Sequence, residues 1–375
     1  MKITSVKAYP ASLQMRVPYR TVFVNRGDSP VAICVVNTDE GVYGVGQATT
    51  SAPGYAPYDE SLEDILAAIR RLAPKLVGVD PRDIAEVQRI MNQVTHGHHY
   101  AHSAVDVAVY DVLGKAAGVP VWRLLGGRIH KSIRVTAVLC YLSPQEVAAE
   151  ARAYVEKGYT HINLRAGRGL NEDVAILAAV REAIGPKIDI DVDFSQSLSL
   201  YQGRPDIAIH YIRELEKFRI NTFEQPLAAW DLKGMSRITA AIETPVIADE
   251  GAFSIHDVLR IAEMGAADGI KVKMIKFGGL YGALQVATLA QAAGLSIVVG
   301  HGLAGVIQNA AEAHFAATLK NLRLPGEMIG FANMAKDVGT GLELRGGELP
   351  VPEAPGLGVN VDVSALESLA RQAGG

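Results

Sequence analysis

The sequence predicts an α/β protein made of a TIM-type barrel preceded by a smaller α+β domain. Two observations carry this prediction. After residue 128, short apolar segments alternate with amphipathic helical segments at a step of roughly 25–30 residues, as in a (β/α)-barrel. Before residue 128, β-branched segments come first and helical segments follow, which is typical of an α+β unit. We therefore expect a capping domain over 1–128, completed by the tail 351–375, and a barrel over 129–350.

The capping domain begins with strands and continues with helices. Apolar, β-branched runs predict strands over 2–10, 30–38 and 42–48. The turn signal at 38–41 makes the last two a hairpin. Apolar residues at helical spacing predict helices over 61–78, 81–94 and 101–118. Ser61 is a suitable N-cap, because Glu63 and Asp64 follow in the first turn.

The barrel segments can be followed one by one. Strands are predicted over 133–140, 161–165, 188–194, 221–226, 245–250, 269–275, 295–301 and, more weakly, 327–331. Helices are predicted between them over 144–158, 171–185, 205–218, 254–265 and 282–294. A doubly wound open sheet is the alternative. It is disfavoured because no Gly-x-Gly-x-x-Gly follows the first strand of the alternation.

Composition narrows the class of protein. The chain has 375 residues, of which 49% are hydrophobic and 20% charged, with a formal net charge of −4. The lack of a basic excess argues against nucleic-acid binding. No apolar run of about 20 residues predicts a membrane span. Cys34 and Cys140 lie in apolar runs and are expected to be buried, reduced thiols of a cytoplasmic protein.

Acidic residues end three consecutive barrel strands. Asp193, Glu224 and Asp249 stand at these ends, and the catalytic groups of a TIM barrel come from the carboxyl ends of its strands. Three neighbouring carboxylates repel one another unless a cation lies between them. Oxygen ligands favour Mg²⁺. Glu250 could replace Asp249 as a ligand, Asp191 shares the strand face of Asp193, and simple pairing of these acids with lysines is the alternative.

Basic residues end other strands. Lys273 follows strand six and could act as a general base, because a lysine beside a metal can lose its proton. Lys271 lies on the same strand face, so the sequence leaves open which of the two reaches the substrate. Arg165 ends strand two, across the barrel, and His301 ends strand seven. Either could bind or protonate a substrate.

The chain resembles the muconate-lactonizing and mandelate-racemase branch of the enolase superfamily over nearly its full length. The matching segments are SAVDVAVYDVLGKAAGVPVWRLLGG, DFSQSL, FEQPL, ADEG, KVKMIKFGGL and APGLGV. The resemblance implies a capping α+β domain and a barrel of the modified (β/α)7β type. It also implies abstraction of the proton beside a substrate carboxylate, with a metal stabilising the enediolate.

The resemblance also implies site residues. Asp193, Glu224 and Asp249 would be ligands of Mg²⁺, with Mn²⁺ as the alternative metal, and Lys273 would be the base. Loops near 16–28 and 47–60 would close over the mouth and select the substrate. The residues expected to bind substrate are Arg16, Tyr19, Tyr55, Asn163, Glu250 and Lys271, with Arg20 and Tyr58 also available in the loops.

Several positions depart from the family pattern. Asn163-Leu164-Arg165 stands where muconate-lactonizing relatives usually carry Lys-x-Lys, and Asp193-Phe194-Ser195 stands for Asp-x-Asn. The Gly-Glu-Ala of the capping domain is Gly46-Gln47-Ala48. The acid often found after strand seven falls near Ala304, with His301 nearby, and Lys273 stands where the dyad of mandelate racemase has Asp.

These departures bear on the reaction. Racemisation needs a base on each face of the substrate carbon, and Arg165 is a poor base because a guanidinium stays protonated. One-base dehydration or cycloisomerisation of a small organic acid therefore ranks first. Racemisation or epimerisation of an amino acid, dipeptide or hydroxy acid is the alternative.

Two rival classes remain open. The barrel could have lost catalysis and only bind a ligand. It could also be a zinc hydrolase, for which His96 and His98 are the candidate ligands, although they precede the barrel. For partners, we expect a small carboxylate-bearing substrate, no nucleic acid, no membrane, and a homo-oligomer, either a dimer or an octamer.

Overall fold

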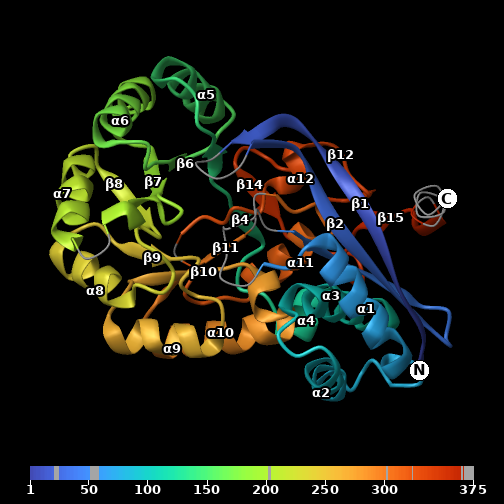
Figure 1. The fold of residues 1–375 in the computed structure, drawn as a ribbon. Coiled ribbons are helices and arrows are strands. Elements are labelled where there is room, and N and C mark those ends of the chain that lie inside the picture. The colour runs from blue at the N-terminus through green and yellow to red at the C-terminus, as the bar shows by residue number, and fades with distance from the viewer. Residues whose placement is uncertain are drawn as a thin grey trace.

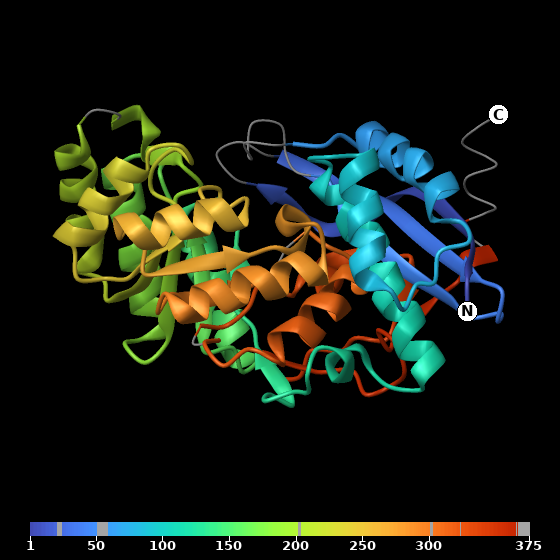
Figure 2. The ribbon, with the colours of Figure 1, turned by 90° about the horizontal axis from the view of Figure 1, so that it is seen from below.

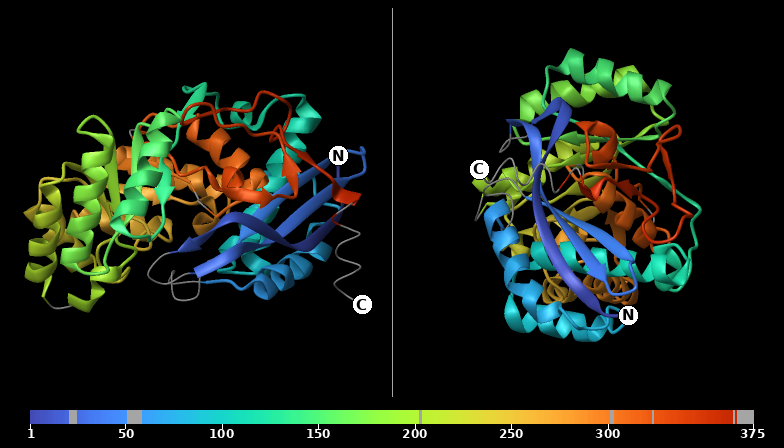
Figure 3. Two further views of the ribbon diagram at one scale, coloured as in Figure 1. Left: turned by 90° about the horizontal axis from the view of Figure 1, so that it is seen from above. Right: turned by 90° about the vertical axis from the view of Figure 1, so that its right-hand side faces the viewer.

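The structure is a computed structural model in which two domains pack side by side (Figure 1). It describes residues 1–20, 25–50, 59–201, 204–300, 303–322, 324–364 and 366. In the left view of Figure 3 the capping sheet lies toward one end of the molecule and helices α7 (Pro205–Glu216) and α8 (Leu232–Ala241) lie at the other, with α5 (Pro144–Glu156) between them. No helix in this part of the chain is both long and apolar enough to cross a membrane.

The capping domain holds an antiparallel sheet in the order β12-β1-β2-β3. Its strands are β1 (Ile3–Arg20), β2 (Asn25–Thr38), β3 (Tyr43–Thr49) and β12 (Met334–Lys336). The predicted hairpin and first strand are confirmed. β1 runs much further than the predicted 2–10, so residues 16–20 and 25–28 of the segment that the resemblance implied to be a loop belong to β1 and β2, which pair there at Tyr19 with Arg26 and at Arg20 with Asn25. The two strands extend past the core because each supplies the other's backbone hydrogen bonds.

Helices α1 (Leu62–Leu76) and α3 (His99–Ala117) cover this sheet, and α2 (Ile84–Val94) packs against these two helices. Ser61 forms the predicted cap, in a capping box with Asp64. α3 lies very close to β3, because Gly44 and Gly46 face it. A Cβ on Gly46 would stand 1.9 Å from the carbonyl oxygen of Ala104, so a larger residue would force the two elements apart.

The barrel is a curved parallel sheet of seven strands in the described residues, in the order β11-β10-β9-β8-β7-β6-β5. The strands are β5 (Ala137–Leu139), β6 (His161–Arg165), β7 (Asp189–Asp193), β8 (Ile220–Glu224), β9 (Val246–Ala248), β10 (Gly269–Val272) and β11 (Ser296–Val299). The weakly predicted eighth strand is reduced to a single bridge between Val135 and Gly326. The segment around Glu327 nevertheless follows β11 at the edge of the sheet, since the amide of Glu327 donates to the carbonyl of Val299.

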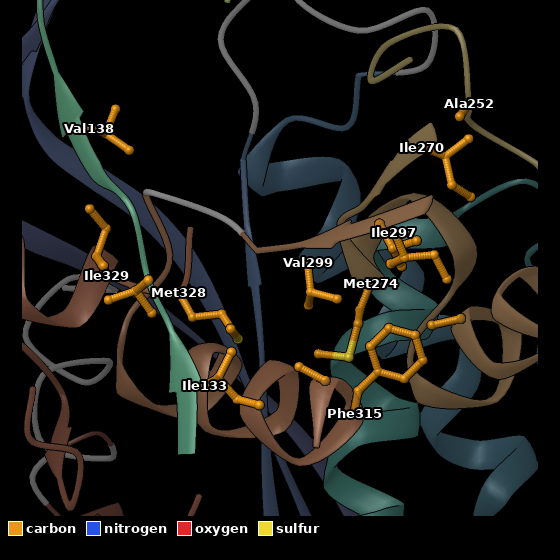
Figure 4. Packing of buried hydrophobic residues seen from close by; sticks show 14 of the residues in the cluster. Ile133, Val138, Ala252, Ile270, Met274, Ile297, Val299, Phe315, Met328 and Ile329 are labelled. Atoms are coloured by element: carbon orange, nitrogen blue, oxygen red, sulfur yellow. The ribbon is translucent and has the colours of Figure 1, made fainter. Parts of the chain in front are cut away.

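Helices cover the outside of the barrel (Figure 1). After α5 come α6 (Leu170–Ile184), α7 (Pro205–Glu216), α8, α9 (Ile255–Met264), α10 (Leu280–Ala292) and α11 (Val306–Ala316). Several begin at side-chain caps: Ser143 with Glu146, Asp231 with Gly234, and Ser254 with Asp257. Between the strands and helices, apolar side chains such as Met274, Ile297, Val299 and Phe315 pack together (Figure 4).

The two domains are joined through α3, which lies between the capping strands and the barrel (Figure 2). Asp106 on α3 accepts hydrogen bonds from the amides of Leu280 and Tyr281 at the start of α10, at 2.6 and 3.3 Å. The C-terminal tail also touches the capping domain, because Val121 donates to the carbonyl of Gly356. The domain boundaries at 128 and 351 remain a prediction.

The two cysteines are both free. Cys34 is buried in β2, whereas Cys140 is partly exposed at the end of β5, which is more than the sequence suggested.

Candidate functional site

Strand register brings the predicted site residues together at the barrel mouth. Arg165 on β6 lies opposite Asp193 on β7, and Asp193 lies opposite Glu224 on β8. Asp249 directly follows β9, and Lys273 directly follows β10. All five side chains are buried, so their charges interact in a medium of low polarity.

Each of the three predicted metal ligands faces a cationic side chain. Arg165 is ion-paired with Asp193, and its Nη2 donates to the hydroxyl of Tyr19 at 2.7 Å. Lys273 is ion-paired with Asp249. Asp249 also receives two hydrogen bonds from Lys276, at 2.9 Å to Oδ1 and 2.9 Å to its carbonyl oxygen.

Lys271 is the most enclosed cation of the site. Its Nζ lies 2.8 and 2.7 Å from the two carboxylate oxygens of Glu224, and 2.7 Å from Oε1 of Glu327. Asn163 Nδ2 donates to the same Glu327 oxygen at 2.9 Å. Despite the desolvation that opposes charge, these carboxylates raise the pKa of Lys271 above its usual range.

Glu327 is the site residue that sequence reasoning missed. It lies at the start of the predicted eighth strand, whereas the acids named from the sequence lie at or just after the ends of strands. Burial raises the pKa of Glu327, but the cations Lys271 and Arg165 outweigh it and hold that pKa below its ordinary value. The available signal was Glu327 at the start of EMIGF, directly after Pro325-Gly326, which is a turn followed by a short apolar segment that begins with an acid.

Glu250 stands apart from the other acids. It is 1% exposed, and neither of its carboxylate oxygens has a hydrogen-bond partner among the described residues. Burial first, and the neighbouring charge of Asp249 second, raise its pKa to about 8. An unsatisfied buried carboxylate is costly, so this side chain calls for a cation or a proton.

Asp191 lies deeper than Asp193 on β7 and is held by neutral donors. Thr222 Oγ1 and Asn221 Nδ2 donate to its Oδ1 at 2.7 and 2.8 Å. Burial raises its pKa to about 6. Because two neutral donors already hold its Oδ1, Asp191 is better suited to linking β7 and β8 than to holding a metal.

The electrostatic balance of the mouth fits a divalent cation. In the described part of the barrel strands and the residues just after them, six carboxyl groups and four cationic groups are buried, so full ionisation leaves an excess of two negative charges. The acids are Asp191, Asp193, Glu224, Asp249, Glu250 and Glu327, and the cations are Arg165, Lys271, Lys273 and Lys276. No three acidic, His or Cys side chains in the described residues converge into a ready-made cage. The donor set is nevertheless all oxygen, which is the chemistry of Mg²⁺.

The remaining predicted residues lie around the mouth or outside the described residues. Tyr55, Tyr58 and His301 fall on positions that the structure does not describe. Arg16 is exposed, and its Nε donates to the carbonyl of Ala332 at 3.3 Å. Tyr19 is packed against Arg165, and burial raises its pKa to about 12.

Gln47 and His98, two residues that the sequence singled out, both have partners within the protein. Gln47, in place of the family's Glu, is buried, and its Oε1 accepts from the amide of Gln308 on α11 at 3.3 Å. His98 lies in the capping domain before α3, where its Nδ1 is 3.2 Å from Glu60, and not at a barrel strand.

A cavity of about 390 Å³ opens beside Tyr19. Its walls include Arg16, Tyr19, Cys140, Glu150, Tyr154 and Leu303. Two of these, Arg16 and Tyr19, are residues that the sequence assigned to substrate binding, and Tyr19 links the cavity to Arg165.

Comparison with known proteins gives a consistent result. Residues 3–126 match the model of the mandelate racemase/muconate lactonizing enzyme N-terminal domain, and residues 146–365 match the enolase C-terminal domain-like model. An N-succinyl-L-Arg/Lys racemase of Bacillus cereus is 32% identical over 372 residues, which cover 98% of each chain. A muconate cycloisomerase of Acinetobacter baylyi is 30% identical over 94% of this chain and 95% of its own.

Solved structures agree with these matches. The crystal structure of the N-succinyl Arg/Lys racemase from Bacillus cereus superposes with a TM-score of 0.93 at 31% identity, covering 99% of this chain and 98% of its own. A dipeptide epimerase from Enterococcus faecalis, complexed with Mg and the dipeptide L-Leu-L-Tyr, superposes with a TM-score of 0.90 at 28% identity. It covers 96% of this chain and all of its own.

Proposed function

Because this chain belongs to the mandelate racemase/muconate lactonizing enzyme branch of the enolase superfamily, we propose that it removes the proton beside a carboxylate of a small organic acid and completes the reaction with one base. The preferred outcomes are dehydration or cycloisomerisation. The observation that carries the choice of one base is the position of Arg165, whose guanidinium pairs with Asp193 at the strand end across the barrel from Lys273.

In this proposal Asp193, Glu224 and Asp249 hold the divalent cation. Such a cation, when bound, supplies stabilisation for the negative charge that develops on the substrate carboxylate. The oxygen-only donors, the unsatisfied Glu250 and the excess of negative charge support this assignment. The relative from Enterococcus faecalis, solved with Mg, supports it as well.

Lys273 would take the proton at its Nζ. It lies at the mouth, follows β10 directly and is 7% exposed, slightly more than Lys271 and Lys276. Lys271 is held between two carboxylates, and Lys276 between a carboxylate and two carbonyls, so both are poorly placed to move toward a substrate. Arg165 would bind a substrate anion or steady the developing charge from the other face, because it stays protonated.

Racemisation or epimerisation is the second candidate, and a specific observation favours it. Relatives that align over almost the full chain include an N-succinyl-L-Arg/Lys racemase and a hydrophobic dipeptide epimerase. Such a reaction requires a second acid on the face of Arg165. Arg165 itself and His301, which lies outside the described residues, are the candidates for that role.

The decisive experiment is a deuterium-exchange screen. Purified protein with Mg²⁺ in heavy water would be mixed with acid-sugar, amino-acid, N-acyl amino-acid and dipeptide libraries, and exchange and product followed by mass spectrometry. One-base chemistry predicts exchange with one enantiomer of a hit and none with its mirror image. Equal exchange of both would make epimerase the leading assignment, and no exchange by any acid would favour a ligand-binding barrel.

A further inference from the structure

At the barrel mouth, Lys271 is the centre of a buried cluster of charged side chains. The side chain of Lys271 is 1% exposed and bridges Glu224 on β8 and Glu327 beside β11. No other described cation is ion-paired with either carboxylate. Two carboxylates this close would repel each other strongly without it.

Asn163 on β6 approaches the same place from the other side. Its Nδ2 and the Nζ of Lys271 both bond Oε1 of Glu327, at 2.9 and 2.7 Å. A single carboxylate oxygen of Glu327 thus accepts hydrogen bonds from both β6 and β10. One cation and one neutral donor therefore meet at this oxygen, and a second cation in place of Asn163 would repel the first.

Resting on the proposed function, we propose that Lys271 is a positioning residue: its fixed charge holds Glu224 and Glu327 in place, and this charge could be supplied equally well from position 163. Lys271 then neither takes the substrate proton nor binds the substrate. It fixes the carboxylate of Glu224 at the mouth and leaves proton transfer to Lys273. This replaces the role in substrate binding that the sequence suggested for Lys271.

The test is a relocation of the charge. Lys271→Met keeps most of the volume but removes the cation, and breaking a buried pair should lower the unfolding midpoint of the metal-free protein by roughly 5–10 °C. It should lower substrate deuterium exchange at least ~100-fold. The double variant Lys271→Asn with Asn163→Lys exchanges the two side chains and nearly conserves volume. It should recover most of the midpoint and at least a tenth of the exchange rate.

Asn163→Lys alone is the matched control. With Lys271 still present, it places two cations at Glu327, so it should be destabilised and slow. If each single variant is destabilised but the double variant recovers, the effects of the two substitutions do not add, as expected for neighbouring residues. The recovery would then come from relocation of the charge.

Three results would overturn the proposal. Lys271→Met with an unchanged midpoint and rate would mean that only volume matters. A double variant that regains its midpoint but stays without exchange would mean that Lys271 acts on the substrate itself. A double variant as unstable as Lys271→Met would mean that position 163 cannot supply the charge. The midpoints are measured in EDTA, so they decide the role of Lys271 even if no acid is exchanged and the proposed function fails.

Discussion

Arg165 has two partners, and both limit what it can do. It is ion-paired with Asp193 on the neighbouring strand and donates to Tyr19 of the capping domain at 2.7 Å. Asp193 is thus paired with an arginine, whereas the alternative left open by the sequence was pairing of the strand-end acids with lysines. This pairing does not exclude a role of Arg165 toward the substrate, because a guanidinium has five N–H donors.

Arg165→Lys is the sharpest change at this position. A lysine can lose its proton where an arginine practically cannot, so the variant gains a titratable group on the second face. We expect new, slow exchange with the enantiomer that the unaltered protein leaves untouched, measured by mass spectrometry in heavy water. Lys273→Ala in the same protein should eliminate exchange with the original enantiomer. Failure of Lys273→Ala to do so would remove Lys273 as the base.

The three strand-end carboxylates can each be tested by an isosteric change. Asp193→Asn, Glu224→Gln and Asp249→Asn should each lower substrate exchange at least ~100-fold and reduce bound Mg²⁺, because each removes an anionic ligand from a hard-cation site. Metal content is measured on the purified proteins. Asp189→Asn is the matched control, because Asp189 begins β7 at the other end of the barrel, where it is 52% exposed and pairs with His161. A variant with normal metal content and rate would take its residue out of the site.

At the scale of elements, the junction of α3 with α10 is the clearest contact between the domains. Asp106 on α3 accepts from the first amides of α10 and from Gln88 Nε2, at 2.6 Å for the latter. A carboxylate at a helix N-terminus satisfies amides that the helix itself leaves without partners. Gly279 is needed beside it, since a Cβ there would lie 2.3 Å from Oδ2 of Asp106.

This junction predicts a pH dependence of stability. Burial raises the pKa of Asp106 to about 7, although the amides of α10 and Gln88 oppose the rise. A folded-state pKa above the unfolded one means that the group's contribution is greatest below about pH 4 and is lost as the pH rises through 7. Asp106→Asn cannot ionise, so its stability should not decrease in this way. The free energy of unfolding of the variant, minus that of the unaltered protein, should therefore rise by roughly 2–4 kcal/mol between pH 5 and pH 8.

Urea unfolding at the two pH values measures the change. Glu63→Gln, at an exposed carboxyl in the first turn of α1, is the control and should show no such difference. A pH-independent effect of Asp106→Asn would show that only the hydrogen bonds of this side chain matter.

At the scale of the whole molecule, a cation bound among the acids of the mouth would couple metal binding to folding. A ligand that binds only the folded protein stabilises it by about 2.7 kcal/mol at 100 times its dissociation constant. We expect millimolar Mg²⁺ to raise the unfolding midpoint by several degrees over EDTA, with KCl of equal ionic strength as the control. Asp193→Asn should abolish the rise. An equal response to KCl would mean that only screening is at work.

Assembly remains a prediction from the sequence. The low net charge offers little resistance to self-association, and we expect a homo-oligomer, a dimer or an octamer. Light scattering at micromolar concentration measures the mass directly. A monomer would contradict the expectation.

The sequence by itself determined the class of fold and the positions of the strand-end residues. Alternation of apolar strands and amphipathic helices has a period that is visible without coordinates, and the ends of strands follow from it. This is why Asp193, Glu224, Asp249 and Lys273 could be named in advance and are found together at one end of the barrel. Their roles in metal binding and proton transfer remain predictions.

Only the tertiary structure decided which charges meet. Lys271 and Lys273 are equivalent by strand periodicity, yet Lys271 lies between Glu224 and Glu327 while Lys273 faces Asp249. Glu327 comes from a segment with almost no strand pairing, 103 positions after Glu224 in the chain. Ion pairing depends on distances of a few ångströms between residues far apart in sequence, and local patterns carry no information about such distances. Closure of the barrel brings Glu327 beside Lys271. This contact is what distinguishes Lys271, proposed to carry a fixed charge, from Lys273, proposed to move a proton.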